Sequence, residues 1–177
     1  CRYSNNYGMQ PLDTMIKKTY QTYQSSGIRE LLALSSQVYR EYPFVLRLGR
    51  ADISGTIDVL FFDPQREIWT ILDYKSNEIE AQRISEEIQH HGYDIQMQLY
   101  ALAVSRLLHV EHVRSILFFT FPGTVYDAVD LSPGTLEALE ARIATFLEQF
   151  SEGKIDVSQK QLACEECEYR DYEACLF

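Results

Sequence analysis

Two aspartates and a lysine interrupt a pair of apolar segments in the middle of the chain. Asp58 lies in the segment Ser54–Phe62, and Asp73 and Lys75 lie at the end of the segment that begins at Glu67. Both segments are typical of β-strands, and their faces are apolar enough that we expect cover on both sides. Carboxylates in such a face are costly unless a positive charge balances them. Lys75 supplies one positive charge, and a divalent cation is the natural second.

The loop between these segments predicts where the two carboxylates lie. Residues 63–66 are expected to close a hairpin in which residue 62 faces 67 and residue 58 faces 71. Asp58 and Asp73 then share one face as diagonal neighbours, about 7–8 Å apart, and can converge on one ion. Such an ion lowers the pKa of a bound water and stabilises charge on a phosphate. Lys75 is placed to orient or deprotonate that water, or to stabilise the phosphate, so the set is sufficient to hydrolyse a phosphodiester.

A purely structural interpretation of the same residues stays open. An aspartate at the end of a strand is commonly a turn or cap residue. The chain also holds a second acidic-x-Lys triplet, Glu152-Gly153-Lys154, at a predicted helix end where no chemistry is expected. The shared face, the neighbouring strand and the apolar surroundings favour the metal site.

The elements around these residues predict one α/β domain. Residues 11–40 are expected to form two helices broken at 25–27, the second with a stripe that continues to Val38. Strands are expected at Tyr42–Leu48, Ser54–Phe62, Glu67–Tyr74, Val113–Thr120 and, as a short one, Val125–Val129. A helix is expected at Tyr93–Leu108, and another begins at Ser132-Pro133 with a buried stripe of Leu136, Leu139, Ile143, Phe146, Leu147 and Phe150.

Composition excludes several classes of protein. The chain has 177 residues, is 46% hydrophobic and carries a net charge of −10. These values exclude disordered and fibrous proteins, and the acidic total argues against a passive nucleic-acid coat. No apolar run reaches the roughly 18 residues that a membrane span needs. Residues 1–50 are nevertheless basic, and Lys17, Lys18, Arg29, Arg40, Arg47 and Arg50 are the candidates for contact with a DNA backbone.

The cysteines are clustered. Cys164, Cys167 and Cys175 crowd into the tail, and Cys1 begins the chain. A secreted disulfide framework would be spread more evenly, so the tail favours metal or cluster ligation. Reduced surface thiols and a zinc knuckle remain alternatives.

Three motifs in order resemble the PD-(D/E)xK nuclease superfamily, in particular the nuclease domain of RecB and AddA-type helicase–nucleases that process DNA double-strand ends. They are Gly55-Thr56-Ile57-Asp58, then Ile71-Leu72-Asp73-Tyr74-Lys75-Ser76-Asn77, then Tyr93-Asp94-Ile95-Gln96-Met97-Gln98-Leu99-Tyr100-Ala101-Leu102-Ala103. The resemblance implies a restriction-endonuclease-like core, with a central mixed β-sheet in αβββαβ order flanked by helices. It is clear over residues 41–121.

The resemblance also implies roles for individual residues. Asp58, Asp73 and the backbone carbonyl of Tyr74 would bind Mg²⁺ or Mn²⁺, and Lys75 would be the catalytic lysine. Gln96 and Tyr100 match a Gln-x-x-x-Tyr motif whose i, i+4 spacing puts both on one helix face, to contact DNA or to brace the lysine. Taken without the resemblance, Gln96 is better explained as the polar edge of a core helix.

Two features depart from the family pattern. An upstream helix usually offers a further His or Glu ligand, but His90, His91, His109 and His112 all follow the lysine. Among the upstream glutamates, Glu41 resembles a strand entry and Glu30 has no support. Some members hold a [4Fe–4S] cluster with one cysteine before the core and three after it. Cys1, Cys164, Cys167 and Cys175 resemble that set, although the gap before Cys175 is long.

The resulting expectation is a cytoplasmic, divalent-metal-dependent deoxyribonuclease, an exonuclease of DNA-end processing and recombinational repair. Its partners would be DNA ends and a helicase domain in the same chain or a partner subunit, with no membrane. We expect 1–177 to be a single nuclease domain from a longer protein, with a helical lead-in (1–40), a core (41–150) and a cysteine-containing tail (151–177). The alternatives are a catalytically defective DNA-end-binding or scaffolding module of the same fold, and a stand-alone nuclease that trims single strands.

Overall fold

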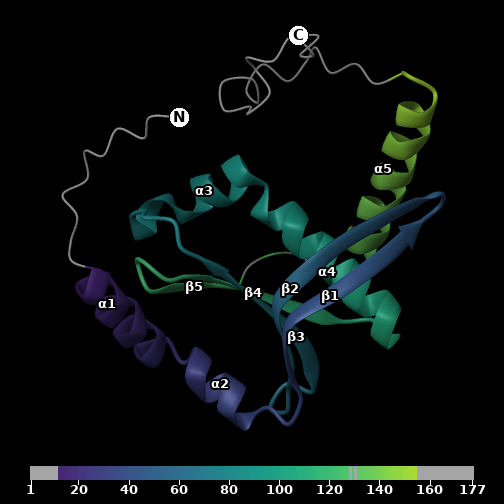
Figure 1. Cartoon of the computed structure of the whole chain (residues 1–177). Helices are drawn as coiled ribbons and strands as arrows, with labels where there is room; N and C mark the ends of the chain where they lie inside the picture. The colour runs from purple at the N-terminus through teal and green to yellow at the C-terminus, as the bar shows by residue number, and fades with distance from the viewer. Residues whose placement is uncertain (1–11, 128, 130, 155–177) are drawn as a thin grey trace, which may run out of the picture. The chain divides into compact units, whose positions relative to one another are not determined.

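A five-stranded mixed sheet forms the centre of the protein (Figure 1). The computed structural model describes residues 12–127, 129 and 131–154. The strands β1 (Val38–Leu48), β2 (Ala51–Asp63), β3 (Ile68–Lys75), β4 (Val113–Phe119) and β5 (Thr124–Tyr126) lie side by side in this order. β3 and β4 are parallel, and every other neighbouring pair is antiparallel. The predicted α/β fold with a mixed central sheet is confirmed.

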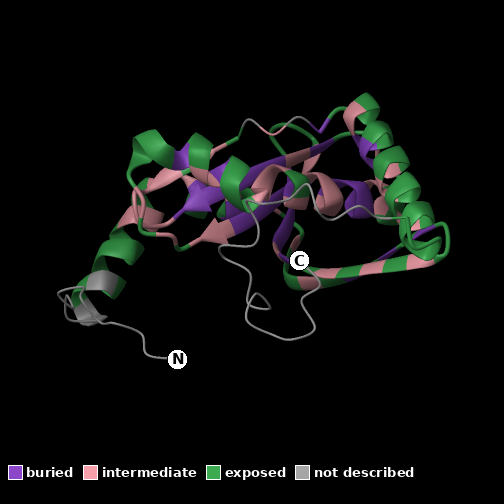
Figure 2. Cartoon of the chain, turned by 90° about the horizontal axis from the view of Figure 1, so that it is seen from above, coloured by how far each residue is buried: buried purple, intermediate pink, exposed green. Residues whose placement is uncertain are grey.

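Helices cover both faces of this sheet. α1 (Leu12–Ser25) and α2 (Ile28–Leu34) precede it, and α4 (Tyr93–Leu108) is the crossover between the parallel strands β3 and β4. On one face Ile28 and Leu32 of α2 pack in a core cluster with Val59, Leu72 and Phe118. On the other face α4 contacts β3 and β4. Buried residues are concentrated in the sheet, as Figure 2 shows.

The segment between β3 and α4 contains helix that the sequence pattern did not predict. A short 3₁₀-helix, η1 (Ala81–Arg83), leads into α3 (Ile84–His91), and Gly92 separates α3 from α4 with a φ of 63°. This left-handed conformation is one that glycine adopts at low cost, and it ends α3. None of the helices described in 12–127, 129 and 131–154 is long and apolar enough to cross a membrane.

The predicted register of the central hairpin was wrong by two residues. The loop is residues 64–67, and Phe62 pairs with Trp69 and Asp63 with Ile68. Asp63 remains in the strand because it is buried and its Oδ1 accepts hydrogen bonds from the backbone N–H groups of Gln65 and Arg66, which closes the turn. The carboxylates at positions 58 and 73 are consequently opposite each other rather than diagonal, while the prediction that they share a face stands.

The predicted second helix was too long. The break at 25–27 is present, but α2 ends at Leu34 and β1 begins at Val38. The Ser35 hydroxyl donates to the Leu31 carbonyl, and Ser35 itself adopts an extended backbone. Val38 then pairs with Phe61 of β2, since a β-branched residue gains more from packing on the sheet than from extending a short helix.

The last helix, α5 (Pro133–Ser151), begins where it was predicted, with the Ser132 hydroxyl accepting from the Thr135 N–H. Its predicted buried stripe was only half right, because Leu136 and Leu139 are buried but Phe146 and Phe150 are exposed. Contacts divide the chain into a larger unit that ends at Glu140 and a smaller one that begins at Ala141. In the described part of the smaller unit, the two phenylalanines stack on each other, 6.4 Å between ring centroids, instead of entering a core.

Candidate active site

Asp58 lies where β2 and β3 separate. Pairing between these strands ends at Val59 and Leu72, and residues 73–75 of β3 pair with β4. The backbone N–H of Tyr74 therefore needs another acceptor, and Asp58 Oδ2 accepts it at 2.9 Å. One more step of the hairpin register puts Asp58 opposite Asp73, so the two carboxylates predicted to act together are adjacent.

Asp73 is a buried carboxylate with an unusual balance of charges. The residue is 3% exposed, and its Oδ2 lies 2.8 Å from Lys75 Nζ. Burial raises the pKa of the Asp73 carboxyl, the Lys75 ammonium opposes the rise, and the charge of Asp58 adds to it. The contact with Lys75 therefore only partly offsets the effect of burial on the Asp73 carboxyl.

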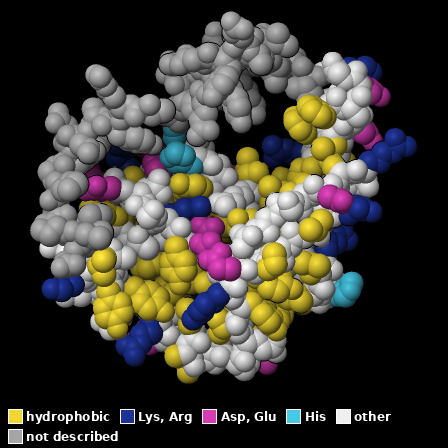
Figure 3. Space-filling model, viewed as in Figure 1, with side chains coloured by type: hydrophobic (Ala, Val, Ile, Leu, Met, Phe, Trp, Pro, Cys, Tyr) yellow, Lys and Arg dark blue, Asp and Glu magenta, His cyan; other side chains and the backbone are white. Residues whose placement is uncertain are grey.

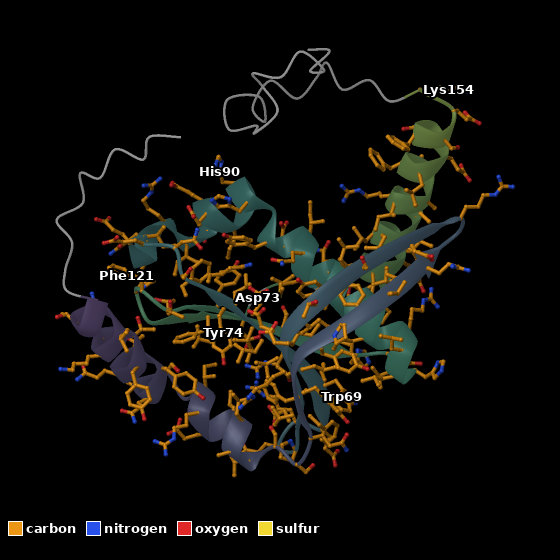
Figure 4. The ribbon with its side chains drawn as sticks, viewed as in Figure 1. Trp69, Asp73, Tyr74, His90, Phe121 and Lys154 are labelled. Carbon is orange, nitrogen blue, oxygen red and sulfur yellow. The ribbon has the colours of Figure 1, made fainter. Side chains whose placement is uncertain are left out.

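Lys75 directly follows Asp73 and Tyr74 (both labelled in Figure 4) on β3, and three groups contact its ammonium. Besides the Asp73 contact, its ammonium donates to Gln96 Oε1 at 2.8 Å and lies over the ring of Tyr93, 3.9 Å from the centroid. The ammonium therefore has a carboxylate oxygen, an amide oxygen and an aromatic face as its partners. The lysine side chain is 11% exposed, which leaves it a narrow access to solvent.

The structure brings Gln96 and Tyr100 to the lysine. Both lie one turn apart on α4, and Gln96 Nε2 donates to the Tyr100 hydroxyl at 2.9 Å while its Oε1 accepts from Lys75. Tyr100 packs edge-on against Phe44, 5.6 Å between ring centroids. Phe44 in turn fills the space beside Gly55, where a Cβ would lie 2.8 Å from two of its ring atoms. A continuous line of contacts therefore runs from Gly55 through α4 to Lys75.

Tyr93, which contacts Lys75, is itself held by a group of residues to which the sequence pattern assigned no role. The Tyr93 hydroxyl donates to Asn77 Oδ1 at 3.2 Å, and Asn77 Nδ2 donates to Glu87 Oε1 at 2.8 Å. Glu87 Oε1 also lies 3.1 Å from His91 Nε2, and the His91 ring stacks on Tyr93. The available signal was spacing, because Tyr93 precedes Gln96 by three positions in a helix and so shares its face.

The donor atoms at this position fit a hard divalent cation. Asp58 and Asp73 offer carboxylate oxygens and Tyr74 offers a backbone carbonyl, which are the ligand types that Mg²⁺ and Mn²⁺ prefer. Asp73 Oδ2 is buried and, apart from its contact with the ammonium, has no hydrogen-bond partner of good geometry in the described part of the chain. An added positive charge would relieve this imbalance.

Among the described residues, no third side chain joins these carboxylates as a ligand. Within 12–127, 129 and 131–154, no group of three or more His, Cys, Asp or Glu side chains is arranged to hold a metal. Glu30 in α2 and Glu41 in β1 are both exposed, and His90 and His91 lie in α3. The four cysteines fall outside the described residues, so the suggested cluster or zinc site remains a prediction.

Curated relatives are similar to parts of this chain. The RecBCD enzyme subunit RecB of Buchnera aphidicola subsp. Baizongia pistaciae is 33% identical over 81 residues, which are 42% of this chain and 7% of that protein. An ATP-dependent helicase/nuclease subunit of Desulfitobacterium hafniense is 33% identical over 92 residues, which are 49% of this chain and 7% of that protein. The chain therefore spans a small fraction of the length of these relatives.

Solved structures and a family model are also similar to this chain. A solved protein of Eubacterium rectale superposes with a TM-score of 0.47 and 14% identity over 77% of this chain and 55% of that one. The family model described as "PD-(D/E)XK nuclease superfamily" matches residues 7–172. That match covers nearly the whole chain, including both aspartates, the lysine and the helix that carries Gln96 and Tyr100. The chain belongs to the PD-(D/E)XK nuclease superfamily.

Proposed function

We propose that this protein hydrolyses DNA phosphodiester bonds with the help of a divalent cation. One observation carries the proposal: where β2 leaves β3, Asp73 contacts Lys75, and Asp58 accepts from the backbone N–H of Tyr74 between them. Such an excess of negative charge in a partly buried position is suited to a cation and then to a phosphate. Membership of a nuclease superfamily supports the same reaction class.

Each residue has a definable task in this proposal. Asp58, Asp73 and the Tyr74 carbonyl hold Mg²⁺ or Mn²⁺, which when bound supplies Lewis acidity and a more acidic water. Asp58 also fixes the backbone of Tyr74 through its hydrogen bond to the N–H, and so sets the position of the neighbouring donors.

Lys75 acts in this proposal as a fixed positive charge. Its ammonium is held by a carboxylate, an amide oxygen and an aromatic face. A positive charge held in this way can stabilise negative charge that develops on a phosphate oxygen. We therefore assign Lys75 to electrostatic stabilisation of the phosphate.

Gln96 and Tyr93 are positioning residues for the lysine. Gln96 orients the ammonium through its Oε1 and is itself held by the Tyr100 hydroxyl. Tyr93 covers the opposite side and is fixed by Asn77. A lysine side chain has about 2 kcal/mol of rotamer entropy to lose, so these contacts reduce what must be ordered when substrate binds.

The wider context is part of the same proposal. Because the similar segments belong to RecB and to an ATP-dependent helicase/nuclease subunit, we propose that the chain works as the nuclease module of a helicase–nuclease, as an exonuclease on DNA ends during recombinational repair. Its partners are then DNA ends and a helicase domain, in the same chain or in a partner subunit.

The test compares two lysines in similar sequence contexts. Purified protein is incubated with linear DNA in Mg²⁺, Mn²⁺ or EDTA, alongside Lys75→Ala and Lys154→Ala. Lys154 follows Glu152 as Lys75 follows Asp73, but it is 70% exposed and belongs to the smaller unit, outside the one that carries the candidate site. We expect metal-dependent cleavage that Lys75→Ala loses and Lys154→Ala keeps. Equal cleavage by Lys75→Ala would refute the mechanism.

The lack of a third carboxylate or histidine at the described site favours one second candidate. In this alternative the chain binds DNA ends without cutting them, as a scaffolding module of the same fold. Binding of DNA without cleavage in Mg²⁺ or Mn²⁺, also in a longer protein that includes the natural upstream residues, would establish it.

A further inference from the structure

The second half of α5 carries an apolar stripe that the described part of the protein leaves largely uncovered. Leu139, in the first half, is 4% exposed, whereas Phe146 is 53% and Phe150 68% exposed. Ile143 and Leu147, which complete the stripe, are partly buried. Figure 3 shows hydrophobic side chains at the surface on one side of this helix and charged ones on the other. The proposed hydrolysis uses none of these side chains.

The spacing of the apolar stripe is typical of a helix face that another segment covers. Positions 143, 146, 147 and 150 follow the i, i+3, i+4, i+7 pattern by which helices present apolar anchors to a partner. A single exposed apolar side chain is ordinary, but neighbouring ones on two turns of helix form a contiguous patch. The rings of Phe146 and Phe150 stack with 6.4 Å between their centroids, so each covers only part of the other. The apolar stripe therefore still has surface to bury.

The end of α5 turns the chain beside this stripe. Gly153 has a φ of 66°, and its N–H donates to the Phe150 carbonyl, while the Lys154 N–H donates to the Gln149 carbonyl. These two bonds make a Schellman motif, in which a left-handed glycine ends the helix and changes the direction of the chain. The segment that follows Lys154 therefore starts next to the last turn of α5, which carries Phe150.

The sequence after this turn supplies apolar side chains at a suitable spacing. Ile155 and Val157 alternate with the polar residues Asp156 and Ser158. In an extended segment, residues two apart lie on one side, and each residue advances about 3.3 Å. The seven helical steps between positions 143 and 150 rise about 10.5 Å. About three to four extended residues are thus enough to run along the whole apolar stripe.

The family match favours this following segment as the cover. The PD-(D/E)XK model matches residues 7–172, so the domain that the family shares includes a segment after α5. That segment is joined to the helix through residues 152–154 alone. A short connection of this kind gives an effective concentration of about millimolar, whereas a second copy or another protein must bind from solution.

We propose that residues 155–172 dock on the apolar stripe of α5, with Ile155 and Val157 against its two phenylalanine rings. The contact is apolar packing, so it requires neither a metal ion nor ligation by cysteine. The docked segment holds Cys164 and Cys167 beside α5 even when they bind nothing. The stripe that the sequence predicts to be buried is then buried by a part of the same chain.

Nuclear magnetic resonance of the full chain tests the contact directly. Methyl groups of Ile, Leu and Val and ring protons of Phe are observed in an otherwise deuterated protein, and nuclear Overhauser effects (NOEs) between them report contact. Wild type is compared with three variants, which are the double variant Phe146→Ser, Phe150→Ser, the control Ala141→Ser, and the triple variant Cys164→Ser, Cys167→Ser, Cys175→Ser.

The variants separate the apolar stripe from the helix and from the cysteines. Phe and Ser have similar helix propensities, so the double variant removes the rings without weakening α5. Ala141 is exposed and lies on the other side of α5, since successive residues are about 100° apart around a helix. The triple variant removes every cysteine of the 155–177 region.

In wild type we expect NOEs from the rings of Phe146 and Phe150 to the methyl groups of Ile155 and Val157, and upfield shifts of these methyl signals. The double variant should move both methyl signals to the positions they have in an unstructured peptide. The methyl signal of Ile116, a core residue, should stay in place and show that the fold is kept. The control and the triple variant should give the wild-type spectrum.

A mixed sample tests whether a second copy covers the stripe instead. Half of the molecules carry only observable methyl groups and the other half only observable Phe rings, so contacts within one chain give no NOE. NOEs in this sample would show a second copy on the stripe and would overturn the proposal. It is also overturned if wild type lacks the NOEs, if the Ile155 and Val157 signals are unchanged in the double variant, or if the control or the triple variant loses the NOEs.

Discussion

Replacing Gly55 with alanine should disturb the active site from a distance. Gly55 pairs with Phe44 across β1 and β2, and its φ lies outside the left-handed region. The backbone therefore accepts alanine, and only the surroundings resist it. An added Cβ would lie 2.8 Å from Phe44 Cε1 and Cζ and 3.5 Å from Tyr100 Cε1. The Phe44 ring must move, and it packs on the tyrosine that holds Gln96.

The expected magnitude follows from the cost of overpacking. Inserting a methyl group into a packed site costs about 1–3 kcal/mol, and for a chain of this size each kcal/mol lowers Tm by about 2–4 °C. Because the displaced rings lead to Lys75, kcat should fall while KM for DNA changes little. Thermal unfolding and steady-state cleavage kinetics measure the two effects.

Two further variants make the reasoning refutable. Gly134, in the first turn of α5, has nothing within 4 Å of an added Cβ, so Gly134→Ala should raise stability by up to about 1 kcal/mol. Phe44→Leu frees space beside Gly55, so the double variant should lose less than the sum of the two single losses, by about 0.5 kcal/mol or more. Strict additivity, or a Gly55→Ala protein as stable as wild type, would show that the contact is not tight.

Two other changes probe the charges. Because burial raises the pKa of Asp73, this carboxyl makes a contribution to the stability of the metal-free protein that is fully present below the ordinary aspartate pKa of about 3.9 and is lost as pH rises through the folded-state value. In denaturant titrations in EDTA, Asp73→Asn should remove this loss of stability with rising pH, and the variant should not cleave DNA. Mn²⁺ at 100 times its Kd should raise the free energy of unfolding of wild type by about 2.7 kcal/mol and leave that of the variant unchanged. An equal rise in the variant would exclude Asp73 as a ligand. Gln96→Leu removes a hydrogen bond to a charged group, which is worth about 1.5–3 kcal/mol. It should therefore lower kcat roughly 10- to 150-fold and leave KM unchanged. A change in KM alone would instead assign Gln96 to DNA binding.

Local patterns were enough to predict most elements of this fold. The bounds of α4 agree with the periodic run Tyr93–Leu108, and α5 starts at the Ser132-Pro133 cap. The sequence pattern was insufficient where a segment is compatible with both helix and strand. Residues 35–40 were predicted to continue a helix, but the helix ends at Leu34 and a strand begins at Val38, because Val38 and Tyr39 gain pairing with residues of β2 that are distant in sequence.

In the central hairpin, the alternation of side chains determines which residues share a face, and the turn determines which residues pair. That Asp58 and Asp73 share a face follows from the period of two along each strand, and it survives a register shift of two residues. Which residue lies opposite which depends on the loop, and the side chain of Asp63 closes a loop one residue later than predicted. The carboxylates are therefore nearer neighbours than the sequence suggested.

The sequence by itself determined the residues that could do chemistry here: two acidic positions and a lysine on one face of adjacent strands, and a glutamine and a tyrosine one helical turn apart. Only the tertiary structure decided what surrounds the lysine. Gln96 lies 21 positions after Lys75 in the chain, and it and Tyr93 reach the ammonium because α4 crosses the sheet. A pocket between α1 and the sheet likewise joins Tyr20 and Tyr23 with Tyr74 and Phe118. Such contacts join residues far apart in the chain, and the path that brings them together is set by packing of the whole core, which no local pattern encodes.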